Sequence, residues 1–221
     1  MESASDLLIR ISPENGKITL EQQLDGVESR KEITQSSLIE SVKGSIQFES
    51  RPSGFLPANC LFVSLSPDCR RYVLWYPQLH ADVILYETQY LQFPLPRLVF
   101  GYSLDSKGKA SNCSMGVIRD ETPGPETPMF YYPFSNVFDD GRICLGHNSL
   151  PIYQQAHKSV SLPGYLLSIP NNFDMFSAER NRLKLGYRDL MEHLKDKAPA
   201  YYYEKVLVPN GKTLADFIGR G

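Results

Sequence analysis

The sequence predicts an α+β domain, because strand-like segments come first and helical segments follow them. Between residues 56 and 119 the chain is rich in β-branched and aromatic residues, and turn-forming residues separate the apolar runs. Residues 185–197 (LGYRDLMEHLKDK) instead place apolar side chains at helical spacing. The expected architecture is an antiparallel β-meander flanked by helices, with an N-terminal hairpin as an addition.

Residues 1–45 are expected to form that hairpin and a first helix. The segment LLIRISPENGKITLEQQ alternates apolar and polar residues around a turn, where Asn15 and Gly16 tolerate positive φ. Gly44 is the expected end of the helix. The apolar residues of ITQSSLIESVKG that stand near helical spacing are Ile33, Leu38, Ile39 and Val42.

Residues 46–128 are expected to form the meander. Its predicted strands are PANCLFVSLS, RRYVLWYPQ, ADVILYETQYL, RLVFGYSL and SMGVIRD. The prolines and glycine of DETPGPETP predict a loop over residues 120–128. Residues 129–221 then hold an irregular cysteine loop and C-terminal helices. We expect the whole chain, residues 1–221, to be a single domain.

Composition limits the classes of function. A net charge of -2 and a pI near 6.1 offer no basic field, so nucleic acid is not an expected partner. No apolar run approaches the ~18 residues of a membrane span, so no membrane partner is expected. Four cysteines without a CxxC pair fit a reduced, cytoplasmic protein. Cys144 and His147 lack a second spaced pair of ligands, so we expect neither a metal nor another cofactor.

The segment YPFSNVFDDGRICLGHNSLP, residues 132–151, contains the candidate nucleophile, Cys144. An Asp-Asp-Gly turn precedes this cysteine and should project the following residues toward the surface. The thiolate is the reactive form of a cysteine, and Arg142 is a candidate to favour that anion. The remaining cysteines, expected in the core or in a turn, are Cys60, Cys69 and Cys113.

The spacing of Asn136, Gly141 and Cys144 resembles the active-site strip of ubiquitin-conjugating enzymes, in which a His-Pro-Asn triplet, a turn glycine and a cysteine-leucine pair recur. With PLPRLVF before the strip and VLVPNGKTLADFI at the C-terminus, the chain resembles the prokaryotic family D of ubiquitin-conjugating-like proteins, which includes protein B of the PRTRC systems. Phe134 and Ser135 replace the histidine and proline of the triplet. Only the asparagine is therefore shared.

The resemblance implies a ubiquitin-conjugating-like fold and a transferase that carries a ubiquitin-like modifier as a thioester on Cys144. The implied partners are that modifier, a ThiF-like activating enzyme and a JAB-type deconjugating protease, encoded in bacterial mobile or antiviral-defence loci. In ubiquitin-conjugating enzymes the first helix contacts the activating enzyme, so Glu40 and Lys43 are the candidate contact residues here.

Each assisting residue has both a chemical and a structural interpretation. Asn136 either donates to the oxyanion that develops during transfer or closes a turn. His147 is a candidate base or a loop hydrogen-bonding residue. Asp139 and Asp140 either form the turn or steer an incoming lysine, and Arg142 either favours the thiolate or is only a solvated charge.

Other functions compete with conjugation. The main alternative is a non-catalytic module of the same fold, which docks the modifier or the activating enzyme. A cysteine hydrolase is disfavoured because no local protease signature surrounds Cys144. The terminal Gly-Arg-Gly, residues 219–221, also resembles the end of a modifier, but the size of the chain and its nucleophile strip argue against that role.

Overall fold

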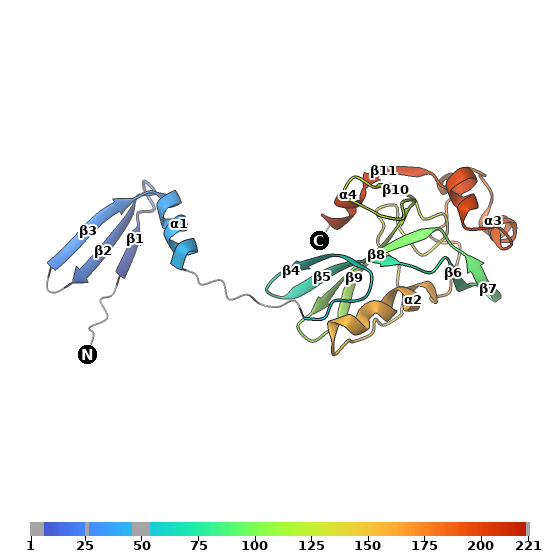
Figure 1. Cartoon of the computed structure of the whole chain (residues 1–221), viewed down its shortest axis with the longest axis horizontal. Coiled ribbons are helices and arrows are strands. Elements are labelled where there is room, and N and C mark those ends of the chain that lie inside the picture. The colour runs from blue at the N-terminus through green and yellow to red at the C-terminus, as the bar shows by residue number, and fades with distance from the viewer. Residues whose placement is uncertain (1–6, 25–26, 46–53, 220–221) are drawn as a thin grey trace. The chain divides into compact units, whose positions relative to one another are not determined.

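The computed structural model describes residues 7–24, 27–45 and 54–219, and contacts group the chain into two compact units, residues 1–52 and 53–221 (Figure 1). The sequence led us to expect one domain. That expectation stays a prediction, and each unit is described by itself below.

The N-terminal unit is a three-stranded antiparallel sheet followed by a helix. The predicted hairpin is confirmed, since Ile11 pairs with Ile18 across the turn. Gly16 has a φ of 66°, and the side chain of Asn15 accepts a hydrogen bond from the Lys17 amide at 3.1 Å. The elements of this unit are β1 (Leu7–Ile11), β2 (Ile18–Leu24), β3 (Val27–Ile33) and α1 (Gln35–Ser45).

Strand β3 corrects the predicted start of the helical segment. Ile33 does not belong to the helix but pairs with Ile18 in the sheet. The helix begins after Thr34, whose hydroxyl accepts a hydrogen bond from the Ser37 amide at 3.1 Å. It also continues through Gly44, where we had placed its end, since one glycine weakens a helix by only about 1 kcal/mol.

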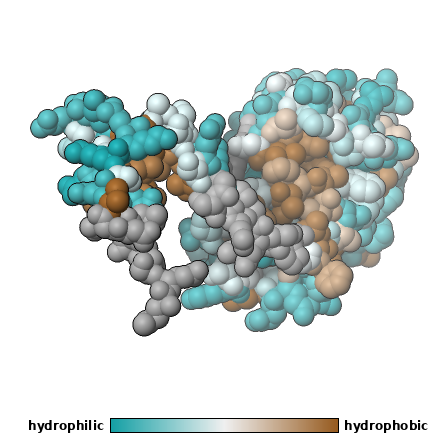
Figure 2. All heavy atoms as spheres, turned by 60° about the vertical axis from the view of Figure 1, so that its left-hand side comes forward, coloured by the Kyte–Doolittle hydropathy of each residue, from teal (hydrophilic) through white to brown (hydrophobic). Residues whose placement is uncertain are grey.

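Much of the apolar surface of this unit is exposed. Among the described residues of this unit, the buried apolar residue is Ile18. Leu7, Ile9 and Ile11 on β1 are 41–63% exposed. Figure 2 shows brown, hydrophobic residues among the teal ones of this unit. Three strands and a short helix of this composition bury little apolar area, which limits the stability of the unit on its own.

The larger unit is built on a six-stranded antiparallel sheet with the strand order β11-β10-β9-β8-β5-β4 (Figure 1). Strands β4, β5, β8, β9 and β10 follow one another as neighbours, which confirms the predicted meander. The strands are β4 (Cys60–Leu65), β5 (Cys69–Tyr76), β8 (Arg97–Asp105), β9 (Ala110–Ile118), β10 (Pro128–Phe130) and β11 (Pro209–Thr213).

The segment ADVILYETQYL forms two strands rather than the single strand that we predicted. Strands β6 (His80–Leu85) and β7 (Thr88–Pro94) make a separate hairpin between β5 and β8. The turn falls at Tyr86, which has a φ of 51°, and Glu87. Neither residue is typical of a tight turn, so its sequence gave no turn signal.

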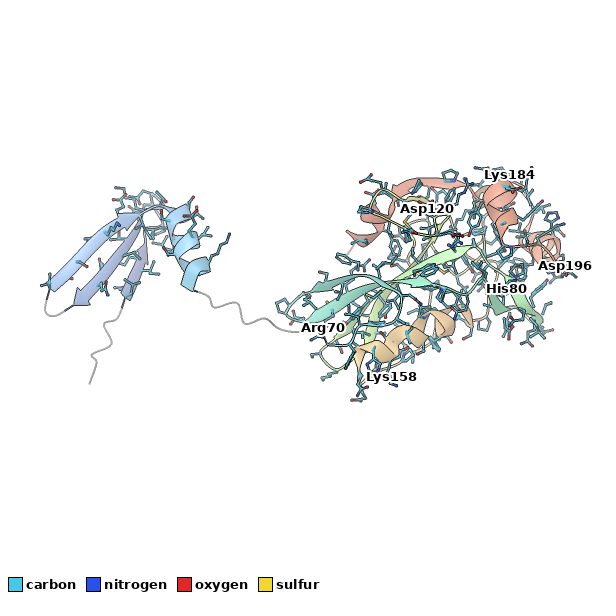
Figure 3. All side chains as sticks on the ribbon, in the orientation of Figure 1. Arg70, His80, Asp120, Lys158, Lys184 and Asp196 are labelled. Carbon is cyan, nitrogen blue, oxygen red and sulfur yellow. The ribbon has the colours of Figure 1, made fainter. Side chains whose placement is uncertain are left out.

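The loop predicted over residues 120–128 is confirmed except for its last residue, where β10 begins. Asp120, labelled in Figure 3, accepts a hydrogen bond within that loop from the Thr127 hydroxyl at 3.1 Å.

Helices cover both faces of the six-stranded sheet. None of the helices in the described part of the chain has the length and apolar character that a membrane crossing requires. The helical segments are η1 (Ala156–Ser161), α2 (Leu162–Leu167), η2 (Ala178–Arg180), α3 (Tyr187–Leu194), η3 (Tyr202–Val206) and α4 (Leu214–Ile218).

Successive side chains along a strand point to opposite faces of the sheet, so the core consists of two clusters, one on each face. The larger cluster lies on the inner face, where α2, α3 and η3 pack against residues such as Tyr72 and Phe100. The smaller cluster lies on the outer face under α4. Its buried members are Val73, Val99, Ile118, Met129, Leu214 and Phe217. Together the elements form an α+β unit with antiparallel sheets, as the sequence predicted.

Candidate functional site

The cysteine strip, residues 136–144, pairs with the part of β9 that the short strand β10 leaves open. The Met115 amide donates to the carbonyl of Gly141 at 2.8 Å, and the Ile143 amide donates to the carbonyl of Cys113 at 2.9 Å. The strip is thereby fixed to the central sheet through its backbone.

The predicted turn closes the strip on itself. The Phe138 amide donates to the Arg142 carbonyl and the Gly141 amide to the Phe138 carbonyl, each at 2.9 Å. Gly141 has a φ of 88°, and a Cβ at this position would lie 3.1 Å from the carbonyl oxygen of Met115. The turn therefore requires glycine both for its conformation and for its close approach to β9.

Cys144 stands at the end of this paired segment. Its amide donates to the Asn136 carbonyl at 2.8 Å, and the residue is half-buried. The flanking residues Ile143 and Leu145 pack against the inner core. After Leu145 the chain turns again, where the Asn148 amide donates back to the Leu145 carbonyl at 2.9 Å. The thiol is thus carried on backbone that is held on both sides.

Asn136 ties the strip to the loop that follows α2. Its side-chain amide donates to the carbonyls of Pro170 at 3.1 Å and Ile169 at 3.4 Å. Its φ is 62°, a left-handed conformation that asparagine tolerates better than most residues. The side chain holds two segments together, and its backbone carbonyl anchors Cys144.

The two aspartates of the turn bind different arginines. Asp140 pairs with Arg142, with 2.7 Å between Oδ2 and Nε, and the Arg142 guanidinium lies over the Phe138 ring. Arg142 therefore has a carboxylate partner within the turn. Asp139 is 2.7 Å from a guanidinium nitrogen of Arg180 in η2.

Arg180 is a site residue that the sequence analysis missed. One of its terminal nitrogens, Nη1, donates to the carbonyls of Val137 at 2.7 Å and Met175 at 3.0 Å, while the other side of the guanidinium meets Asp139. Its side chain is 11% exposed. An arginine in the polar segment SAERNRL carries no local signal for this role, because the partners in the strip, Val137 and Asp139, are 43 and 41 positions away in the sequence.

Phe134, which stands where the triplet of ubiquitin-conjugating enzymes has histidine, lies in an aromatic cluster. It is 2% exposed and makes edge contacts with Phe93, Tyr132 and Tyr202. Its ring also stacks with Tyr187 at 6.2 Å between centroids. This environment suits an apolar ring and explains how the strip is supported without the histidine.

The other cysteines are less suited to nucleophilic chemistry. Burial raises the pKa of Cys113 to about 12 and also raises the pKa of Cys60, so their thiolates are disfavoured. The sulfur of Cys69 lies 3.2 Å from the Ser66 hydroxyl in the turn between β4 and β5. These placements agree with the core and turn positions that the sequence predicted.

The remaining candidate residues lie apart from these contacts. His147 is exposed in the turn after Cys144. Glu40 and Lys43 are exposed on α1, in the N-terminal unit. Within the described ranges no group of three or more histidine, cysteine, aspartate or glutamate side chains is arranged to hold a metal ion.

The arrangement can support acyl transfer through Cys144. A half-buried thiol on fixed backbone can be presented to a large partner, and its thiolate attacks carbonyl carbon. The side-chain amide within the strip itself is that of Asn136, and the imidazole closest to Cys144 in the sequence is that of His147.

Comparison with known families covers most of the chain. Residues 34–209 match the family model of prokaryotic E2 family D. The matched range begins immediately before α1, includes the whole cysteine strip and ends at the start of β11. Comparisons with curated proteins and with solved structures found no match. On the extent of this match, the chain belongs to prokaryotic E2 family D.

Proposed function

We propose that this protein is a bacterial ubiquitin-conjugating-like enzyme with the corresponding fold. Cys144 accepts a ubiquitin-like modifier from an activating enzyme as a thioester and transfers it to an amine. Family membership supports a role related to ubiquitin conjugation. The observation that carries the finer proposal is the half-buried thiol of Cys144, held between backbone contacts to Asn136 and the turn after Leu145.

The first step is exchange between two thioesters. The Cys144 thiolate attacks the carbonyl carbon of the modifier's C-terminal residue, and the thiolate of the activating enzyme leaves. One carbon–sulfur bond forms as another breaks, so the products and reactants have similar free energy. Holding the two sulfurs in good geometry then supplies most of the acceleration. The rigid attachment of the strip to β9 suits this requirement.

The second step is attack by an amine. A neutral amine adds to the same carbonyl, negative charge develops on its oxygen, and the Cys144 thiolate leaves as the amide forms. We assign to Asn136 the positioning of the loop at residues 169–170 or donation to this oxyanion. His147 is the candidate base for the amine proton, and Asp139 and Asp140 are candidates to attract an incoming lysine.

Family membership supports partnership with a ubiquitin-like modifier and an activating enzyme in general. We further propose that the activating enzyme is ThiF-like and that a JAB-type protease removes the modifier. We place the system in the bacterial cytoplasm, in an antiviral-defence or mobile-element locus. The exposed residues Glu40 and Lys43 on α1 are the proposed contacts with the activating enzyme.

A charging reaction tests the proposal. The protein is incubated with its activating enzyme, its modifier and ATP, and the expected product is a heavier species that reductant removes. Cys144→Ala should abolish it. The matched variants Cys60→Ala, Cys69→Ala and Cys113→Ala should leave it intact. A reductant-sensitive product that survives Cys144→Ala would place the chemistry on another cysteine.

The alternative is a non-catalytic module that docks the modifier or the activating enzyme. It is favoured by the pairing of Arg142 with Asp140, which satisfies the basic side chain that we expected to favour the thiolate, and by the loss of histidine at Phe134. Stable binding of either protein without any adduct on Cys144 would support this alternative.

A further inference from the structure

Arg71 is a buried cation in β5, on the outer face of the six-stranded sheet. It is 7% exposed, and its Nη2 donates to the carbonyl oxygen of Phe217 at 3.2 Å. Within the described part of the chain it forms no ion pair, and its buried Nε has no hydrogen-bond partner. Burial also lowers the pKa of Arg71, because it disfavours the charged form. A buried arginine usually has an anionic partner.

A glycine on the neighbouring strand makes room for this guanidinium. A Cβ at Gly101 in β8 would lie 3.2 Å from Nη2 of Arg71 and 2.6 Å from the hydroxyl of Ser114. Any larger side chain at Gly101 would displace both polar groups. Because φ at this glycine is not in the left-handed region, space rather than backbone conformation accounts for the residue.

A pocket of about 420 Å³ adjoins this guanidinium. The sheet contributes Arg71 and Ser114 to its lining, and the cysteine strip with the next residue contributes Phe138, Ile143 and Leu145. Most of the surface that lines the pocket is apolar. A largely apolar pocket of this size with a few polar groups is typical of a small-molecule site.

The charges around the pocket favour a single negative charge. Arg142 also lines it, but its Nε is 2.7 Å from the carboxylate of Asp140, so these two charges compensate each other. Arg71 supplies a positive charge with no carboxylate partner among the described residues. A dianion would bury a second charge without a partner and would approach the Asp140 carboxylate, which is unfavourable.

We infer that this pocket binds a small monocarboxylate with an apolar body. The carboxylate pairs with the guanidinium of Arg71, while the apolar body packs against the rings of Phe138 and Phe217, which also line the pocket. Guanidinium and carboxylate form strong, charge-assisted hydrogen bonds in such surroundings. The site adjoins the cysteine strip without using the thiol, so the inference does not depend on thioester chemistry.

Ligand-observed NMR on the full chain tests the inference, with phenylbutyrate as the probe and its neutral amide, phenylbutyramide, as the matched comparison. The two probes differ in the charge of one terminal group. We expect phenylbutyrate to bind. The affinity of the amide should be lower by a factor of at least about ten, because hydrogen bonds to charged groups are the stronger ones. Equal affinities, or no binding of phenylbutyrate up to about 10 mM, where even millimolar binding is detected, would overturn the inference.

Substitution then locates the site. Arg71→Met removes the charge at similar volume and should abolish the preference for the acid, and replacing a buried charge in this way usually preserves the fold. Arg70→Met is the control, since Arg70, labelled in Figure 3, is exposed on the same strand. It should bind phenylbutyrate like the wild type. Unchanged binding by a folded Arg71→Met protein would overturn the assignment. If that variant unfolds, Arg71→Lys decides: it keeps the charge but lacks the planar fork of donors, so it should bind phenylbutyrate more weakly than the wild type, and an affinity equal to that of the wild type would overturn the assignment.

Discussion

Asn136 joins Cys144 to a second segment of the chain, and this geometry leads to a prediction about the transfer step. Its amide holds the carbonyls of Ile169 and Pro170, and its own carbonyl binds the Cys144 amide. Asn136→Gly removes the amide but keeps a residue that accepts a φ of 62°. We expect this variant to form the thioester normally and to release it to lysine on the order of 100- to 1000-fold more slowly, the usual cost of losing an oxyanion donor.

A single-turnover discharge assay on preloaded protein checks this prediction, with thermal melting measured alongside. Asn136→Ala is the companion variant, because it loses the same amide and adds roughly 1–2 kcal/mol of left-handed strain. A larger fall in stability for alanine than for glycine would identify that strain. Normal discharge by Asn136→Gly would show that the amide has no part in transfer.

The buried thiol of Cys113 gives a pH-dependent prediction. Burial raises its pKa from the ordinary value of 9.0 to about 12 in the folded protein, so above pH 9 the unfolded chain loses this proton while the folded chain keeps it. The unfolded state then binds fewer protons, and stability falls as the pH rises. Near pH 10 the loss from this group is about 1 kcal/mol.

Urea denaturation at pH 8 and pH 10 measures this effect, in the wild type and in Cys113→Ala. Buried tyrosines also destabilise the fold at alkaline pH, so the informative quantity is the difference between the two proteins. The wild type should lose more stability between the two pH values than Cys113→Ala does. An equal loss in both proteins would mean that Cys113 is not held in its neutral form by burial.

At this scale the sequence predicted residues whose roles are local. Gly141 and the aspartates before it form a turn that depends on adjacent residues, and the spacing to Cys144 follows from that turn. Arg180 could not be predicted, because its contacts with Val137 and Asp139 exist only after η2 folds against the strip. The pairing of Arg142 with Asp140 rather than with the thiol likewise required side-chain geometry.

Among the elements, η2 has a specific task, since it supplies the guanidinium that holds the turn of the cysteine strip. Arg180→Ala would leave the carbonyls of Val137 and Met175 without this donor and Asp139 without its partner. We expect a loss of about 1–3 kcal/mol in the free energy of unfolding and slower charging of Cys144. Chemical denaturation and a charging time course measure the two effects.

Asp139→Asn is the matched control, because it removes the ion pair but leaves the carbonyl contacts of Arg180. Asp139 is largely exposed, so this variant should lose at most about 1 kcal/mol and charge at close to the normal rate. If Arg180→Ala were as stable and as readily charged as Asp139→Asn, the carbonyl contacts would not hold the strip.

Helix α1 is the element to which we assign docking of the activating enzyme. Glu40→Lys combined with Lys43→Glu reverses both exposed charges and leaves the net charge unchanged. Because rim charges act mainly on the rate of encounter, charging should become slower and less sensitive to salt. The measurement is the initial charging rate at several salt concentrations. Unchanged kinetics would move docking away from this face of α1, for example to the N-terminal hairpin.

Strands were predictable wherever their pattern was bounded by turn residues, as in β5, β8 and β9. Strand β3 was missed because VESRKEI is mostly charged and has no buried face; its residues are exposed or half-buried. The β6–β7 hairpin was merged into one strand because its turn contains tyrosine and glutamate rather than glycine or proline. In both cases tertiary pairing, not local sequence, determines the element.

For the whole molecule, the meander and the α+β class were predictable, but the division into two compact units was not. The boundary falls in SRPSGFLP, residues 50–57, whose prolines, glycine and serines are typical of a turn or linker, but so short a stretch also occurs within single domains. The family match begins at residue 34, within the first unit, and so includes α1 together with most of the larger unit. The matched range thus contains both the proposed docking helix and the cysteine strip.

The central claim is that residue 144 accepts the modifier, and tandem mass spectrometry of a trapped adduct tests it most directly. Cys144→Ser should convert the labile thioester into an ester that resists reductant, since oxygen replaces sulfur at the same position. After charging and digestion, the account predicts that the modifier's C-terminal residue is attached to the peptide that contains Ser at position 144. Attachment at any other residue, or the absence of an adduct from both the wild type and this variant under conditions that charge the activating enzyme, would contradict it.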